Sequence, residues 1–176
     1  KALALDDTSA QNHALLGYIY STRREYDKAI VEGERAVALD PGGADVHAWL
    51  AQSLMLAERP AEAIPLFEKA IRLNPFGPSW YFLTFANCYV DMRHYEEAVT
   101  QYKKALRIAP DNILAHLGLT SAYSLWGRDE EARAEAQEVL RLDPQFSLES
   151  HAKLLPFKDQ ARTDRIIDAL HKAGLK

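Results

Sequence analysis

Histidines recur at matching places along this chain, and they are the first side chains that could do chemistry. His13 and His47 are 34 residues apart, and His116 follows 69 residues later, about two such intervals. Zinc holds nitrogen ligands at about 2.0–2.1 Å, whereas equivalent positions in neighbouring stacked helices lie roughly 10 Å apart. We therefore interpret the three histidines as packing residues, and we expect neither a metal site nor any other cofactor.

Acidic side chains and a single cysteine are the other candidate catalytic groups. Glu96, Glu97 and Asp129 stand near the starts of predicted helices, where a carboxylate interacts favourably with the helix dipole. Cys88 lies in a predicted helix beside core positions, which favours a buried and unreactive thiol. The sequence has no glycine-rich phosphate loop, no Gly-x-Ser-x-Gly elbow and no His-Glu-x-x-His pair. We expect a protein that is not an enzyme.

The composition favours a folded domain and excludes several other classes of protein. Of the 176 residues, 48% are hydrophobic and 26% are charged, which is enough to bury a substantial core. The net charge of −4 offers no positive field to a phosphate backbone, so we expect no direct binding of nucleic acid. A single cysteine excludes an intrachain disulfide.

Neither a membrane span nor a leader is visible in the sequence. The longest apolar stretch, residues 80–90, is about half the length that a membrane span needs. We therefore expect no membrane insertion and a cytoplasmic location. Because the chain begins with Lys1 rather than Met, we expect it to be a fragment of a longer protein.

The strongest signal in the sequence is an internal repeat. Prolines that close similar short segments recur at spacings of 34, 35 and 34 residues, and alanines recur at the same three spacings. The prolines are Pro41, Pro75, Pro110 and Pro144, and the alanines are Ala29, Ala63, Ala98 and Ala132. Two markers in one register indicate a repeated structural unit of about 34 residues.

Each repeat has the pattern of two amphipathic helices. In the first repeat these helices are expected at about 10–22 and 25–39, because apolar residues recur there at helical spacing. Small residues such as Gly17 and Ala29 let the two helices approach closely. The recurring prolines end each second helix. Pro60 suits the first turn of its helix, whereas Pro65 is expected to bend or loosen that helix.

This pattern resembles the tetratricopeptide repeat (TPR), whose signature spans 34 residues and ends in proline. Four units match, namely residues 10–43, 44–77, 79–112 and 113–146, with Pro78 as an insertion and residues 1–7 as the end of a preceding repeat. Gly33 and Ala136 depart from the pattern, since bulkier residues are usual there. The resemblance implies an all-α fold, a right-handed α-α superhelix in which each unit is stabilised by its neighbours.

The resemblance also implies a concave groove lined by the first helix of each repeat. Carried over position by position, the candidate peptide-binding residues are Tyr18, Gln52, Met55, Trp80, Leu83, Asn87, Asp91 and Ser121. The groove positions include no Lys or Arg, so a clamp for a terminal carboxylate is not expected. Aromatic and amide groups there suit an amphipathic helix or a short extended peptide. The alternative is that Trp80 and Met55 pack within the superhelix and the groove has no dedicated ligand.

Beyond Phe146 the repeat is lost. Residues 147–176 are expected to form a helical cap with a short helix before Pro156 and a second helix at about 159–173, followed by Gly174 as its C-cap. The amino-acid sequence of this tail also resembles the C-terminal tails of TPR regions attached to bacterial class III adenylate or guanylate cyclases and related signalling proteins. No cyclase catalytic motif is present.

These observations lead to one main expectation and two alternatives. The main expectation is a non-catalytic scaffold that binds a protein or peptide in its groove, as an accessory domain of a larger protein. The first alternative is a regulatory region of a bacterial nucleotide cyclase or transcriptional regulator. The second is a self-association module, a homodimer formed through an exposed N-terminal face of the first repeat.

Overall fold

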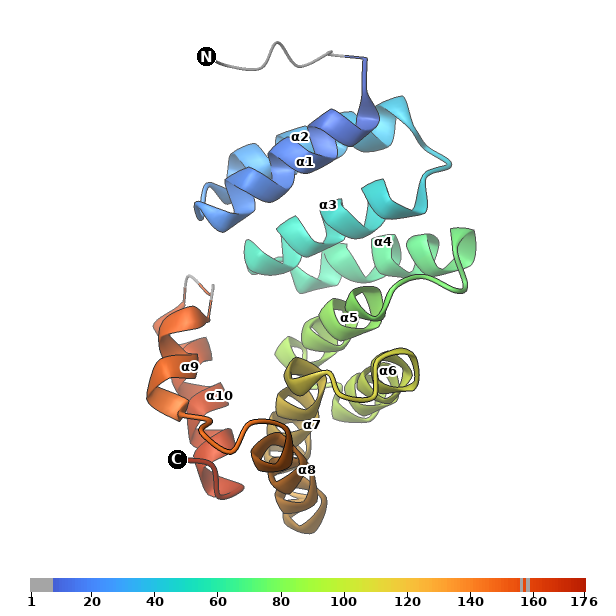
Figure 1. Ribbon diagram of the computed structural model, residues 1–176. Coiled ribbons are helices and arrows are strands. Elements are labelled where there is room, and N and C mark those ends of the chain that lie inside the picture. The colour runs from blue at the N-terminus through green and yellow to red at the C-terminus, as the bar shows by residue number, and fades with distance from the viewer. Residues whose placement is uncertain (1–7, 156, 158) are drawn as a thin grey trace. The chain divides into compact units, whose positions relative to one another are not determined.

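The computed structural model describes residues 8–155, 157 and 159–176, and all regular structure in these residues is helical (Figure 1). The predicted all-α class is therefore confirmed. The chain divides into two compact units, residues 1–77 and 78–176. The expected end of a preceding repeat, residues 1–7, and Pro156 lie outside the described residues.

The N-terminal unit contains two helix pairs. Its helices are α1 (Ala10–Thr22), α2 (Tyr26–Leu39), α3 (Ala44–Leu56) and α4 (Pro60–Leu73). Within each pair the helices are joined by a short turn and pack against each other, and α3 also packs against both α1 and α2. A small core cluster of Ala10, Ala14, Ala36 and Val46 fills the space between these helices.

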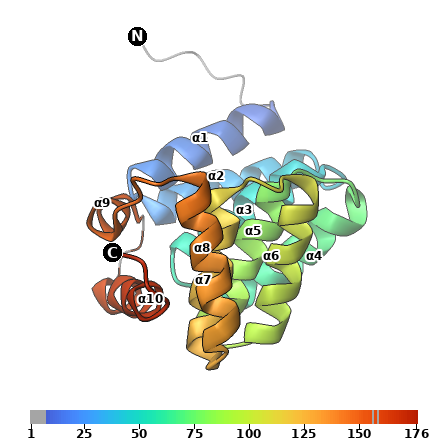
Figure 2. The same cartoon turned by 60° about the horizontal axis from the view of Figure 1, so that its bottom comes forward.

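The C-terminal unit contains two further pairs and a helical tail. Its helices are α5 (Ser79–Asp91), α6 (Tyr95–Ile108), α7 (Ile113–Trp126), α8 (Asp129–Leu142), α9 (Leu148–Leu154) and α10 (Gln160–Lys172). Helix α7 packs against α5, α6 and α8, and α10 packs against α7 and α9. In both ribbon views, α9 and α10 lie on the side of α7 away from α6 (Figures 1 and 2).

Proline and glycine act largely as the sequence predicts. Pro60 is the first residue of α4, where its missing N–H costs no hydrogen bond. The helix continues through Pro65 to Leu73, and the expected bend or loosening at this proline stays a prediction. A Cβ atom on Gly17 would lie 3.1 Å from the carbonyl oxygen of Ala29, which shows how closely α1 approaches α2.

At two glycines, one of them the departure from the pattern at Gly33, a neighbouring side chain fills the space. Leu50 of the second repeat lies against Gly33, so that a Cβ on Gly33 would come 2.9 Å from its Cδ1. Tyr102 lies against Gly118 even more tightly, since a Cβ there would be 2.3 Å from its ring. Glycine at these positions lets a side chain from a neighbouring helix pack directly on the backbone.

The tail forms the two helices that its pattern predicts. Helix α9 ends at Leu154, and α10 runs from 160 to 172 instead of the expected 159 to 173. Gly174 follows with a φ of +105°, a conformation that glycine adopts without strain. Among the described residues, no helix is both long enough and apolar enough to span a membrane.

Candidate functional site

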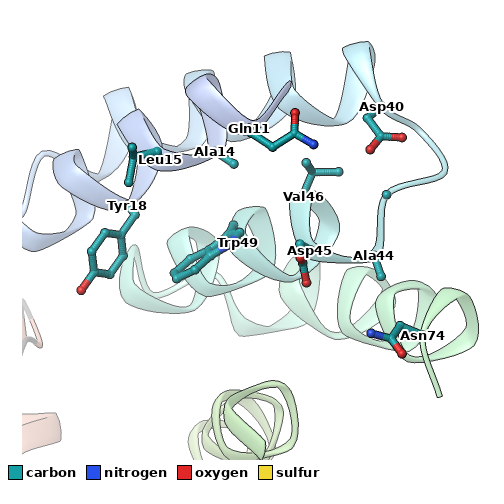
Figure 3. Close-up of a pocket in the computed structure, with 11 residues that line it drawn as sticks. Gln11, Ala14, Leu15, Tyr18, Asp40, Ala44, Asp45, Val46, Trp49 and Asn74 are labelled. Carbon is teal, nitrogen blue, oxygen red and sulfur yellow. The ribbon is translucent and has the colours of Figure 1, made fainter. Parts of the chain in front are cut away.

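The N-terminal unit has a pocket of about 600 Å³ between the first helices of its two repeats (Figure 3). The lining residues come from α1, α3, the α2–α3 turn and the residue after α4: Gln11, Ala14, Leu15, Tyr18, Asp40, Gly43, Ala44, Asp45, Val46, Trp49 and Asn74. The pocket therefore lies on the face that the first helices of this unit share.

Two aromatic side chains form one end of this pocket. Tyr18 of α1 and Trp49 of α3 meet edge to face, with 5.1 Å between their ring centroids. Tyr18 is 43% exposed and its neighbour Leu15 is 57% exposed, so both offer apolar surface to solvent. Such partly exposed aromatic groups in a concavity are the usual anchors of peptide recognition.

The other end of the pocket is polar. Asp40 directly follows the last residue of α2 and Asp45 stands in the first turn of α3, and Figure 3 places both away from Tyr18. Gln11 adds a second amide from α1. Among the described residues that line the pocket there is no Lys, Arg or His. The pocket thus joins an apolar end to an end with two carboxylates.

The predicted residues of the N-terminal unit have different surroundings. Tyr18 lines the pocket, whereas Gln52 is half-buried and Met55 is only 3% exposed, and neither lines it. A ligand could reach the Met55 side chain only if the core opened. Trp49 was missed because it stands between two groove positions of the resemblance. Its large side chain, next to those positions, is the one signal that could have indicated that it lines the pocket.

In the C-terminal unit the predicted residues are largely engaged by the protein itself. Asn87 accepts a hydrogen bond from the Tyr102 hydroxyl at 2.5 Å. Ser121 is buried and donates to the carbonyl oxygen of Gly118. Leu83 packs against the core cluster that contains Leu170 and Leu175 of the tail. Trp80 is half-buried and lies edge-on to Tyr81.

The first-helix face of this unit also holds α10, which packs against α7. Arg162 of α10 forms an ion pair with Asp91 of α5 at 2.5 Å, and the two side chains are 7% and 12% exposed. The ring of Phe157 stacks on the Arg162 guanidinium at 3.6 Å. Burial lowers the pKa of Arg162, and the carboxylate of Asp91 opposes that effect. The sequence pattern gave no signal for this pairing, because the tail does not repeat.

The three recurring histidines are all buried, and each is hydrogen-bonded to another residue of the chain. His13 Nδ1 and His116 Nδ1 donate to Glu32 and Glu135 at 2.6 and 2.7 Å. His47 Nε2 donates to the carbonyl oxygen of Pro41 at 3.1 Å. The three histidine side chains therefore make structural contacts within the fold.

The buried thiol and phenol of the C-terminal unit are poor candidates for reactive groups. Cys88 and Tyr102 are at most 1% exposed. Burial raises the pKa of both well above its ordinary value, and the nearby Asp91 carboxylate adds to the effect. Each group is therefore held in its neutral form, and a thiol in that form is a weak nucleophile.

Comparison with known proteins shows which families and structures this chain resembles. The family model for subunit 3 of the anaphase-promoting complex (cyclosome) matches residues 22–105, and a TPR-repeat model matches residues 86–125. TPR repeat-containing protein YpiA of Bacillus subtilis (strain 168) is 27% identical over 191 residues, which is 89% of this chain and 45% of YpiA. The chain thus spans less than half the length of this relative.

Two solved structures share the fold. PilW, a type IV pilus biogenesis factor, superposes with a TM-score of 0.77 at 19% identity, covering 96% of this chain and 76% of PilW. YrrB, described as a TPR protein with an unusual peptide-binding site, superposes with a TM-score of 0.66 at 19% identity, covering 96% of this chain and 86% of YrrB.

The paired, stacked helices define an α-helical repeat protein. Residues 86–125 match a TPR-repeat model and the solved structures share the fold, so the chain has a helical-repeat fold of the TPR type, which is typical of protein–protein interaction scaffolds. The resemblance of the tail to cyclase-attached TPR regions is not shown by these comparisons.

Proposed function

We propose that this protein is a non-catalytic scaffold that captures a peptide segment or helix from a partner protein in the pocket between α1 and α3. The observation that carries the proposal is the pocket itself, about 600 Å³, with an exposed Tyr18 and a half-buried Trp49 at one end. That volume accommodates a few side chains of a bound segment. The description of YrrB as a protein with a peptide-binding site adds support, because YrrB has the same fold.

The two units contribute differently to this proposal. In the C-terminal unit α10 already packs on α7, and its Arg162 is paired with Asp91. Asp91 could therefore contact a partner only after α10 moved, and Asn87 and Ser121 are already hydrogen-bonded to Tyr102 and Gly118. In the N-terminal unit Tyr18 remains 43% exposed beside the pocket, so this unit is the proposed capture site.

A peptide-display selection tests the proposal directly. Random dodecapeptides would be selected on the purified protein, and the affinities of selected peptides would be measured by fluorescence anisotropy. Tyr18→Ala should weaken them about tenfold or more, as expected for an aromatic anchor. The matched control is Tyr20→Ala, which removes the same ring from α1 where it faces Lys28 outside the pocket. Equal affinity for both variants would place the binding site elsewhere.

The accessory role within a larger protein belongs to the same proposal. It draws support from YpiA, of which the chain matches 45%. A regulatory region of a nucleotide cyclase or transcriptional regulator is one form that role could take. The domains encoded together with this chain in its gene would show whether it is such a regulatory region or another kind of accessory domain.

Self-association is a second candidate function, and the first repeat supplies an observation in its favour. Leu15, Ile19 and Val31 are 57%, 36% and 47% exposed. Aliphatic groups of this kind on a repeat surface favour contact with another copy. Light scattering over a concentration series should then show a dimer that Ile19→Lys dissociates. A monomer at the highest concentration would exclude this candidate.

A further inference from the structure

We propose that the segment captured in the α1–α3 pocket of the N-terminal unit carries a basic side chain, Lys or Arg, next to a large apolar one. This inference rests on the proposed function and specifies the chemistry of the partner. The apolar side chain would contact Tyr18 and Leu15, and the basic group would lie at the end formed by Asp40 and Asp45.

The position of Asp40 is the first argument for a cationic ligand. Asp40 is the C-cap residue directly after α2, where the helix dipole disfavours a negative charge. Asp143 occupies the same place in the fourth repeat, and there the carboxylate accepts a hydrogen bond from the backbone N–H of Gln145. Among the described residues, no Lys or Arg forms an ion pair with Asp40. The negative charge of Asp40 is therefore electrostatically unfavourable in the free protein, and a bound cation would offset that unfavourable energy.

The second argument is the summed charge of the pocket. Asp45 is explained in part by its place in the first turn of α3, where a carboxylate is favourable. It nevertheless borders the same hollow as Asp40, and the lining contributes no positive charge. Two carboxylates beside a concave surface attract a cation and repel an acidic peptide.

The third argument comes from the C-terminal unit, which holds a basic side chain on its own first-helix face. Arg162 is bound there by a carboxylate, Asp91 at 2.5 Å, and by an aromatic ring, Phe157 at 3.6 Å. The pocket of the N-terminal unit offers both kinds of group but contains no Lys or Arg of its own. A partner side chain would supply the cation that α10 supplies in the other unit.

The experiment uses peptides selected on the whole protein, as above, with two kinds of change. In the peptide, each Arg is replaced by citrulline, which keeps the shape and removes the charge. In the protein, Asp40→Asn and Asp45→Asn remove the carboxylates, and Glu68→Gln on the exposed face of α4 is the matched control. Far-UV circular dichroism verifies the fold of each variant.

We expect selected peptides to be enriched in Arg or Lys beside an aromatic or aliphatic residue. Citrulline should weaken binding about tenfold, and the double Asp variant should lose about as much, with little further loss when both changes are combined. Glu68→Gln should bind like the unchanged protein. Rising salt concentration should weaken the Arg peptide more than the citrulline peptide.

The outcomes separate this inference from the proposed function. If citrulline peptides bind as tightly as Arg peptides while Tyr18→Ala still weakens both, the pocket captures peptides but the inferred charge chemistry is wrong. If the selected peptides carry no basic residue, the inference fails in the same way. If the selection yields no peptide that binds, the proposed function fails and the inference fails with it.

Discussion

Removing the charge of Asp91 should release α10 from the C-terminal unit. The Asp91 carboxylate is 12% exposed and faces the guanidinium groups of Arg162 at 2.5 Å and Arg165 at 3.6 Å. Asp91→Asn keeps the shape of the side chain but leaves the buried Arg162 without its counter-charge. Breaking a buried ion pair from one side costs about 3–5 kcal/mol. The loss should fall on the docking of α10, because Arg162 belongs to that helix.

The same helix supplies a matched control. Lys172 of α10 pairs with Asp129 at 2.8 Å, but these side chains are 57% and 42% exposed. Lys172→Gln should therefore have little effect, since exposed pairs are screened by water and salt. A double variant, Asp91→Asn with Arg162→Leu, should recover much of the lost stability, because it leaves no buried charge and Leu fills apolar space.

Hydrogen exchange followed by mass spectrometry measures the effect on α10 alone. A loss of about 3–5 kcal/mol corresponds to exchange roughly two to nearly four orders of magnitude faster, up to the rate of an undocked helix. Exchange of residues 160–172 in Asp91→Asn that is no faster than in Lys172→Gln would refute the assignment of this ion pair as the main attachment of α10. The double variant should exchange more slowly than Asp91→Asn.

Three further variants test other contacts of the C-terminal unit by urea unfolding. Gly118→Ala should destabilise by about 1–3 kcal/mol despite the higher helix propensity of Ala, because its Cβ would meet the Tyr102 ring at 2.3 Å; an unchanged midpoint would contradict this packing. Glu135→Leu should cost about 1–3 kcal/mol by removing the acceptor of His116 Nδ1, and a neutral effect would contradict it. Burial lowers the pKa of His151, so the unfolded chain takes up a proton first as pH falls, and stability should decrease from pH 7.5 to pH 5.5; His151→Gln should reduce that decrease.

The helices could be predicted from the sequence because their signals are local. The expected helix at 10–22 is found at those residues, and the expected helix at 25–39 begins one residue later. Alanines, prolines and apolar spacing within one repeat determine these bounds, and no distant residue is needed. The all-helical fold follows from the same local signals.

The candidate site could be predicted only in part. Tyr18 was identified because its groove position also lines the pocket, and Asp91 was identified as a groove position without its partner. That partner, Arg162, stands 71 residues later in a segment with no repeat register, so periodicity could not reveal the pairing. Asp40 was missed because it lies in a turn, outside the helices to which the groove positions belong.

One pair of positions, 19 residues apart in every repeat, gives a final prediction about how the repeats have diverged. The first and fourth repeats join His to Glu there, whereas the second has His47 with Leu66 and the third has Phe82 with Gln101. His47 Nδ1 and Gln101 Oε1 are accordingly buried without a hydrogen-bond partner among the described residues.

Because Nε2 of His47 donates to Pro41, its Nδ1 can only accept in the neutral ring, and an amide at position 66 would supply the missing donor. Leu66→Gln should therefore be better tolerated beside His47 than beside Phe in the variant His47→Phe. A double-mutant cycle measured by urea unfolding should give a favourable coupling of about 0.5–1.5 kcal/mol. Additive effects would show that the two side chains do not meet, and that the His–Glu contacts of the outer repeats do not extend to the second.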